Sequence, residues 1–397
     1  MSFNLQGYIA RALAKQIKER FEIFPIVAII GSRQVGKSTL AKNLLSDFPN
    51  STFIDLESDS DLHKLENPEL FFSGLRDQLI CIDEIQRKPD IFRLLRVLVD
   101  RRELKQQYLV LGSASPELLK QGSESLAGRI EFLELTPFLF EELSGLKIHP
   151  QELLDRLWLR GGFPRSFLAG TDKQSFLWRQ TFIRTFIERD VFQLGFSIPP
   201  QMLLRFWKII THCHGQMLNT SQIGASLGIS HTTIRKYLDI FVQTFLVRTL
   251  SPYEANFRKR LVKTPKLYIR DSGILHALLN IRSRDELYGN PLFGASWEGW
   301  CIEQIIHAMP NWNPFFYRTS SGEEIDLILQ QGKRLLAFEC KASLTPRLSK
   351  GIEQTLALLK PEKMFVVCPM IADGYPMRDG VEVVGMRECL HALETLA

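Results

Sequence analysis

Short apolar runs and amphipathic stretches alternate along the first third of the chain. Such an alternation is typical of a parallel sheet with helices on both faces. Another amphipathic pattern, over residues 8–20, predicts a helix before the first strand. The fold class expected for this part is therefore α/β, with predicted strands at 26–31, 52–56, 79–83, 108–112 and 130–134.

The middle of the chain has a helical pattern. Helical periodicity runs from Pro137 to about residue 195. Residues 216–241 then predict a helix-turn-helix, with Asn219 or Thr220 capping the first helix and Ser230 capping the second. The apolar segments that follow predict a hairpin, or wing, from 245–250 and 267–270.

The last part of the chain predicts a second, smaller sheet. A helical pattern at 296–309 precedes two apolar strands joined by a tight turn at Gly332, and a helix and another strand follow. The predicted elements after the first helix are strands at 324–329 and 335–341, a helix at 349–360 and a strand at 364–368.

One loop carries a phosphate-binding pattern, G-x-x-x-x-G-K-[ST], between the first strand and a helix. The backbone N–H groups of such a loop and the dipole of the following helix converge on one anion. Lys37 is expected to reach the β- and γ-phosphates of ATP, and Ser38 to ligate Mg²⁺. The predicted cofactor-binding residues here are Gly31, Ser32, Arg33, Gln34, Val35, Gly36, Lys37, Ser38 and Thr39.

Two later strands end in polar residues that suit the same site. The buried pattern 79–82 ends in Asp83 and Glu84, which we assign to Mg²⁺ and to the attacking water. The strand at 108–112 is followed by Ser113, a candidate sensor of the γ-phosphate or a plain strand-end turn serine. Arg129, before the fifth strand, is either a group that acts on a neighbouring subunit's nucleotide or a surface arginine.

Size, composition and charge narrow the possibilities. A chain of 397 residues exceeds one typical core. It has no apolar run of membrane-spanning length and no apparent secretory signal, so no membrane partner is expected. Its six cysteines are scattered, which is typical of reduced thiols in a cytoplasmic protein. The histidines, His212 and His214 included, lack the spacing of a zinc site.

The net charge of +5 hides a basic block. Residues 201–270 hold eleven Lys and Arg against two acids, which suggests a polyanion such as DNA as partner. The helix-turn-helix is the expected contact, although such modules also serve as lids or protein contacts. The predicted nucleic-acid-binding residues are Arg235, Lys236, Arg258, Lys259 and Arg260.

Acidic residues near the C-terminal end suggest a second chemistry. Asp326 and the pair Glu339 and Lys341 lie on the two predicted strands of one hairpin, and Glu298 lies on the preceding helix. Carboxylates and a lysine on one face can hold Mg²⁺ and activate water against a phosphodiester. We therefore predict these four residues as catalytic, with Asp326 and Glu339 as metal ligands; the alternative is a salt-bridged strand pair.

These motifs, in this order, resemble those of the prokaryotic AAA+ ATPases that carry a C-terminal DUF4143 domain. Ser38 stands where many members have threonine, and Arg270 where an apolar residue is usual, so we expect that strand end to be exposed. The landmarks of the resemblance are Gly31–Thr39, 79–84, 112–115, 127–129, 161–164, 188–191, 218–238, 263–273 and 339–343.

The resemblance implies four domains: a AAA+ P-loop ATPase core at 1–140, a helical lid at 141–200, a winged helix at 201–275 and a PD-(D/E)xK nuclease-like domain at 276–397. Pro164, in the break Arg160-Gly-Gly-Phe-Pro164, is then a candidate contact to the adenine, or part of a plain interhelical turn.

We expect an ATP-hydrolysing homo-oligomer, a ring, that binds Mg²⁺ and acts on DNA, with metal-dependent nuclease activity as a further expectation. The alternative is a nucleotide-dependent switch that binds a protein partner and keeps an inactive nuclease-like scaffold.

Overall fold

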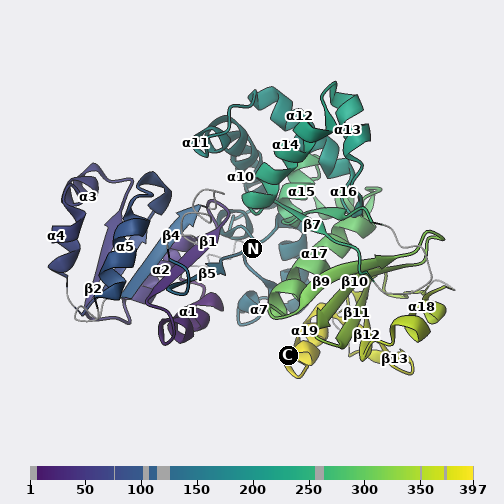
Figure 1. Cartoon of the computed structure of the whole chain (residues 1–397). Helices are drawn as coiled ribbons and strands as arrows, with labels where there is room; N and C mark the ends of the chain where they lie inside the picture. The colour runs from purple at the N-terminus through teal and green to yellow at the C-terminus, as the bar shows by residue number, and fades with distance from the viewer. Residues whose placement is uncertain are drawn as a thin grey trace. The chain divides into compact units, whose positions relative to one another are not determined.

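The structure is a computed structural model that describes residues 7–75, 77–101, 107–113, 126–254, 263–348, 351–370 and 373–396. It divides into two compact units. Residues 6–138, with 243–245, form the smaller unit, and residues 139–242 and 246–397 belong to the larger one. Figure 1 shows the smaller unit in purple to blue and the larger one in teal to yellow.

The smaller unit is an α/β fold with a parallel five-stranded sheet in the order β2-β3-β4-β1-β5. All five predicted strands are present, whereas the helix predicted from residue 8 begins only at Leu13. The strands are β1 (Ile26–Gly31), β2 (Ser51–Asp55), β3 (Leu79–Asp83), β4 (Gln107–Ser113) and β5 (Ile130–Glu134). The helices are α1 (Leu13–Phe21), α2 (Lys37–Leu45), α3 (Asp59–Lys64), α4 (Pro68–Ser73), the 3₁₀ turn η1 (Ile85–Arg87) and α5 (Ile91–Asp100).

Alternating side chains of the central strands form the core of this unit. Ile80 and Ile82 of β3 and Tyr108 of β4 pack with Phe92 and Leu95 of α5. Burying one such side chain contributes about 1.5–3 kcal/mol. Because β1 and β3 are buried along their whole length, the ends of these strands are held rigidly.

The first half of the larger unit is helical and ends in a small antiparallel sheet, β6-β8-β7. The predicted pair of helices is present. Asn219 accepts from the backbone N–H of Gln222 to cap α13, and Ser230 accepts from that of Thr233 in α14. The elements are α7 (Phe140–Leu143), α8 (Pro150–Arg160), α9 (Pro164–Phe167), α10 (Asp172–Thr185), the π-helix η2 (Phe186–Asp190), α11 (Val191–Gln193), α12 (Pro200–His212), β6 (Gln216–Met217), α13 (Thr220–Leu227), α14 (His231–Gln243), β7 (Val247–Leu250) and β8 (Lys266–Ile269).

The second half of the larger unit is built on a mixed six-stranded sheet in the order β13-β14-β12-β11-β10-β9. Strands β10 and β11 form the predicted hairpin, and β12 and β14 continue it in parallel. The helices are α15 (Ser272–Leu278), α16 (Arg284–Tyr288), α17 (Phe293–Ala308), α18 (Ile352–Leu359) and α19 (Met386–Glu394). The strands are β9 (Asn313–Arg318), β10 (Glu324–Gln331), β11 (Arg334–Cys340), β12 (Lys363–Cys368), β13 (Tyr375–Arg378) and β14 (Val381–Gly385).

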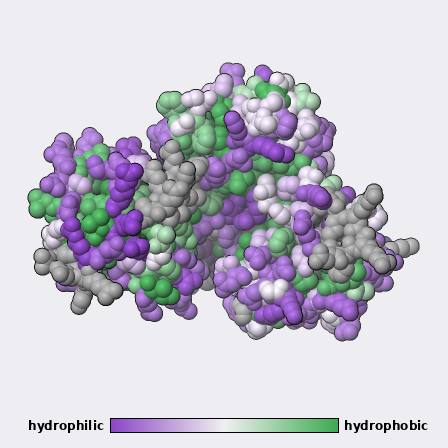
Figure 2. Space-filling model, viewed as in Figure 1, coloured by the Kyte–Doolittle hydropathy of each residue, from purple (hydrophilic) through white to green (hydrophobic). Residues whose placement is uncertain are grey.

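Hydrophilic and hydrophobic residues are intermixed over the face that Figure 2 shows. Within the described ranges, no helix is both long and apolar enough to span a membrane.

The Gly-Gly break after α8 packs against the start of α15. Gly161 has φ 73° and ψ 178°, a conformation that is essentially restricted to glycine. The carboxylate of buried Asp271 accepts from the backbone N–H of Gly162 at 2.8 Å and from that of Ile274 at 2.8 Å. Burial raises the pKa of Asp271 to about 6. Pro164 is the first residue of α9 in this turn.

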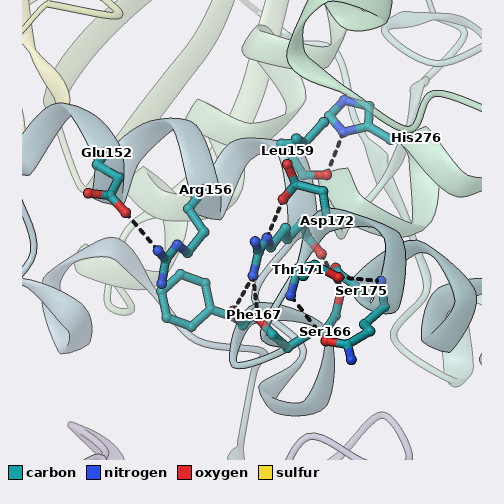
Figure 3. A network of polar contacts seen from close by, with 12 residues as sticks. Glu152, Arg156, Leu159, Ser166, Phe167, Thr171, Asp172, Ser175 and His276 are labelled. Atoms are coloured by element: carbon teal, nitrogen blue, oxygen red, sulfur yellow. Dashed lines mark hydrogen bonds and ion pairs between the residues drawn. The ribbon is translucent and has the colours of Figure 1, made fainter. Parts of the chain in front are cut away.

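Neighbouring polar contacts hold the same junction. The Ser166 and Ser175 hydroxyls lie 2.8 Å apart, and His276 Nδ1 donates to the Leu159 carbonyl at 3.0 Å (Figure 3). Two segments that are more than 100 residues apart in the chain are thereby fixed to each other.

Gly161→Ala tests this junction. A Cβ at Gly161 would lie 2.2 Å from Asp271 Oδ1. A Cβ at Gly195, which also has positive φ (85°), would have no atom of the described residues within 4 Å. We expect Gly195→Ala to lower the free energy of unfolding by about 1 kcal/mol and Gly161→Ala by about 3 kcal/mol or more. Chemical denaturation of both variants measures the difference, and equal losses would contradict this packing.

Candidate functional site

The phosphate-loop pattern forms a tight turn at the carboxyl end of β1. A Cβ on Gly31 would lie only 2.3 Å from the Leu135 carbonyl oxygen, so this position excludes other residues. Gln34 (φ 63°) and Gly36 (φ 102°) both have left-handed backbones, and Gly36 is the N-cap of α2. The loop therefore turns its backbone toward the N-terminus of a helix, as an anion site requires.

Lys37 is folded back onto this loop. Its ammonium donates to the carbonyls of Gly31 (3.1 Å) and Ser32 (2.9 Å), and the side chain is buried. Burial lowers the pKa of Lys37 to about 8, although the nearby carboxylates of Glu84 and Asp83 oppose that shift. The ammonium thus lies between the loop and the acids of β3.

Asp83 is the last residue of β3 and Glu84 follows it, at the same edge of the sheet. The Asp83 carboxylate, 4% exposed, accepts from the Ser38 hydroxyl and from the backbone N–H of Glu84 at 2.9 Å. Glu84 has a left-handed backbone (φ 55°) and its side chain contacts Gln86. Burial raises the pKa of both carboxyls.

A hydroxyl and a carboxylate in contact are oxygen donors of the kind Mg²⁺ prefers. Ser38 and Asp83 therefore fit the predicted metal ligands. Ser113 lies opposite Gly31 in the β1–β4 register, at the loop end of the sheet. Its side chain lies outside the described part of the structure.

Arg11 is a residue of this site that the sequence did not reveal. Its guanidinium donates to the carbonyls of Val35 (3.1 Å) and Thr136 (2.7 Å) and lies 4.9 Å from the ring centroid of Phe138. One buried side chain thus links the phosphate loop to the segment after β5. A single arginine at the start of an amphipathic pattern carries no signal of such a role.

Arg129 lies at the opposite end of the sheet from the loop. It precedes β5, whose Ile130 pairs with Ile26 at the start of β1. Its guanidinium forms a two-pronged ion pair with Asp100, at 2.7 and 3.1 Å. At about 3.3 Å per residue, the length of β1 puts roughly 16 Å between Arg129 and the loop of its own chain.

The predicted DNA-contacting residues are exposed where the structure describes them. Arg235 and Lys236 lie on the solvent side of α14. The predicted residues Arg258, Lys259 and Arg260 lie outside the described residues. Pro164, the candidate adenine contact, belongs to the larger unit, and its role stays a prediction.

Part of the basic block is internal. Arg248 and Arg270 both pair with Glu303 of α17, and Arg270 keeps only 9% of its side chain exposed. The expected exposure of this strand end is therefore wrong, because a carboxylate from a distant helix neutralises Arg270. Lys266, 2% exposed, is also paired with acids. These three cations do not contribute to an external basic surface.

The four residues of the second predicted site lie close together. Asp326 Oδ2 accepts from the backbone N–H of Cys340 at 2.9 Å, and Lys341 Nζ lies 2.5 Å from Glu339 Oε1. Burial and the charges of Glu298 and Glu339 hold the pKa of Asp326 well above its usual value. Burial likewise raises the pKa of Glu339.

A second lysine in this cluster, besides Lys341, is Lys266 of β8. Its Nζ lies 2.9 Å from Glu298 Oε1 and 3.9 Å from Asp326 Oδ1. Among the described residues, no group of three or more His, Cys, Asp or Glu is placed to hold a metal ion. As arranged here, the cluster does not fit a divalent ion, because an ammonium fills it, and the metal role of Asp326 and Glu339 stays a prediction.

The parallel sheet and the loop at its edge define a fold of the P-loop AAA+ type. Residues 24–144 match the family described as "AAA domain", 151–285 match a domain of unknown function, DUF8612, and 293–389 match DUF4143. The chain belongs to the AAA-type proteins with a C-terminal DUF4143 domain.

Two relatives and one solved structure resemble this chain over most of its length. The uncharacterized proteins Rv2008c of Mycobacterium tuberculosis and Mb2031c of Mycobacterium bovis are each 41% identical to it over 94% of this chain and 83% of their own length. A Walker-type ATPase of Pyrococcus abyssi, PABY2304, has a similar fold, with a TM-score of 0.52 and 16% identity over 70% of this chain and all of that one.

The buried ammonium of Lys37 predicts a pH dependence. Its pKa of about 8 in the free protein should rise beside the phosphates of ATP, so binding above pH 8 takes up a proton. Affinity should then fall by up to about tenfold per pH unit above pH 8, and this group should cause no change below it. Calorimetric titration at about pH 9, in two buffers of different ionisation enthalpy, measures the uptake.

The exposed Lys42 on the same helix provides the control. Lys42→Ala should keep the proton uptake of the parent. Binding that releases or exchanges no proton at this pH would contradict the role of Lys37.

Proposed function

We propose that this protein is an oligomeric ATPase that couples ATP hydrolysis to action on DNA. The observation that carries the proposal is the convergence of the phosphate loop of β1, the two acids after β3 and Ser113 of β4 at one edge of the sheet. The membership of the AAA-type family supports it.

The residues divide the reaction between them. The loop amides and Lys37 bind the β- and γ-phosphates, and Ser38 and Asp83 hold Mg²⁺, which offsets the phosphate charge when bound. Glu84, whose carboxylate lies within electrostatic reach of Lys37, orients the attacking water. Ser113 contacts the γ-phosphate. Arg11 is a positioning residue that acts through the Val35 carbonyl.

Arg129 serves the nucleotide of a neighbouring subunit. The distance along β1 excludes it from its own loop, and it lies about one-third exposed, paired with Asp100. Breaking this surface ion pair takes little free energy. An arginine that acts across an interface requires an oligomer, and a closed ring gives every site such a neighbour.

The larger unit supplies the DNA contact. The order α12-β6-α13-α14-β7-β8, with β8 between β6 and β7, matches a winged helix with α14 as the recognition helix. A groove of about 940 Å³ beside α14 includes Arg235 and Lys263 in its lining. A protein partner in place of DNA is the alternative, and the internal pairing of Lys266, Arg248 and Arg270 is the observation that favours it.

The ATPase claim is tested by Glu84→Gln. The amide keeps the shape of the side chain but cannot take a proton from water, so ATP binding should stay within about twofold and turnover should fall by 10²-fold or more, in order of magnitude. Lys37→Ala should lose binding itself. Equal hydrolysis by Glu84→Gln and the parent would remove Glu84 from the reaction.

The shared site is tested by mixing subunits. Arg129→Ala alone should lower hydrolysis, on the order of 10³-fold, with little change in ATP binding. Mixing it with Lys37→Ala should restore part of the activity, since one type of interface is then intact. Asp100→Asn, which frees Arg129, should retain hydrolysis. Failure of the mixture in a preparation that exchanges subunits would argue against a shared site.

DNA binding is tested by reversing charge on α14. The double variant Arg235→Glu with Lys236→Glu should bind DNA more weakly. The slope of log affinity against log salt should become about two units less steep, because two phosphate contacts no longer form and no longer release counterions. Both side chains are exposed, so folding should persist. Reversing Lys15 and Glu19, an exposed pair on α1, is the control. Unchanged affinity in the folded double variant would move the contact elsewhere.

A further inference from the structure

A buried carboxylate cluster in the larger unit lies apart from the phosphate loop. It collects Glu298 from α17, Glu324 and Asp326 from β10, and Glu339 from β11. All four interact with Lys266, either through contacts or through the electrostatic effect of its charge. Lys266 comes from β8, which belongs to the three-stranded sheet and not to the six-stranded one.

The ammonium of Lys266 contacts two carboxylates and lies near an aromatic ring. Its ammonium contacts Glu324 and lies 2.9 Å from Glu298 Oε1, which also accepts from the Tyr268 hydroxyl at 2.5 Å. The ammonium is also 5.6 Å from the ring centroid of Phe316. The side chain is 2% exposed, so its charge is neutralised inside the protein and not by water.

One carboxylate oxygen in the cluster, Glu339 Oε2, makes no hydrogen bond to the described residues. Glu339 Oε1 accepts from Lys341, but its Oε2 is buried and has no hydrogen-bond partner among the residues that the structure describes. A buried carboxylate oxygen without a partner is unfavourable, and a bound cation would relieve that cost. Because Glu339 interacts electrostatically with Glu298 and Asp326, this oxygen belongs to the same group of acids.

The charged side chains of the cluster would be out of balance without the ammonium of Lys266. Among the residues that the structure describes, the cations at the cluster are Lys266, Lys341 and Arg318, which pairs with Glu324. They face four carboxylates. Without Lys266, two more carboxylates than cations would remain, which matches the charge of one divalent ion. Oxygen-only donors of this kind select a hard cation such as Mg²⁺ or Mn²⁺.

We propose that Lys266 is an internal cation that closes a latent divalent-cation site formed by Glu298, Asp326 and Glu339. An ammonium and a divalent ion at these oxygens exclude each other, because they repel and need the same ligands. The metal affinity of these oxygens is therefore set by whether the ammonium of Lys266 occupies them. This inference goes beyond the proposed function and does not depend on ATP hydrolysis.

The test is a titration of the nucleotide-free protein with Mn²⁺. The electron paramagnetic resonance signal of the free ion measures how much Mn²⁺ remains unbound at each step. The parent and the Asp326→Asn variant should bind the same amount of Mn²⁺, because the site is closed in the parent. Lys266→Met, which keeps most of the stem and loses the charge, should bind one Mn²⁺ per chain at least roughly tenfold more tightly than the parent. Adding Asp326→Asn to Lys266→Met should abolish that site.

Two further variants test whether the effect depends on the position and on the charge of Lys266. Lys263→Met, at an exposed lysine three residues earlier, should titrate like the parent. Lys266→Arg keeps a cation and should also gain no site. If Lys266→Met does not fold, the parent still decides, because a tight Mn²⁺ site in the parent that Asp326→Asn removes would overturn the proposal. Folded Lys266→Met that binds no Mn²⁺ would overturn it as well.

Discussion

Three cations at the small sheet of the larger unit, Lys266, Arg248 and Arg270, form ion pairs with carboxylates of the C-terminal part. These ion pairs constrain how that unit is built. Lys266 is 2% exposed, and Glu303, which receives both Arg248 and Arg270, is 6% exposed. Removing one partner of a buried pair leaves an uncompensated charge, which typically destabilises a protein by about 3–5 kcal/mol. The small sheet and α17 are therefore expected to remain associated, and movement of β8 alone requires that Lys266 find other partners.

The same ion pairs change the meaning of the basic block. Its excess charge in the sequence suggests one large surface for a polyanion, but Lys266, Arg248 and Arg270 face inward. The exposed cations of the block that the structure describes are Arg205 and Lys208 on α12, Arg235 and Lys236 on α14, and Lys263. The proposed DNA contact therefore has fewer exposed charges than the composition suggests, which makes the choice between DNA and a protein partner an experimental one.

The sequence predicted features that depend on local pattern. The five strands of the smaller unit follow from short apolar runs, and the phosphate loop follows from glycines whose backbones only glycine favours, such as Gly36. The caps at Asn219 and Ser230 and the β10–β11 hairpin are local as well. In these cases, the residues that determine the structure are close together in the chain.

Contacts between distant residues were not predicted. The link from Arg11 to Thr136 spans 125 positions and that from Arg248 to Glu303 spans 55, and neither leaves a periodic signal. The expected exposure of Arg270 was wrong for this reason. The sequence also does not show that Lys266 lies 3.9 Å from Asp326, and the metal role predicted for Asp326 and Glu339 stays a prediction.

The central claim is that ATP turnover is coupled to DNA through α14. Its most direct test is the steady-state ATPase rate of the parent with and without single-stranded, duplex and branched DNA, beside the Arg235→Glu, Lys236→Glu variant. We predict that at least one DNA stimulates the parent several-fold and that the variant keeps its basal rate but loses the stimulation. A slow rate that no DNA changes would contradict the coupling and favour a nucleotide switch that acts on a protein partner.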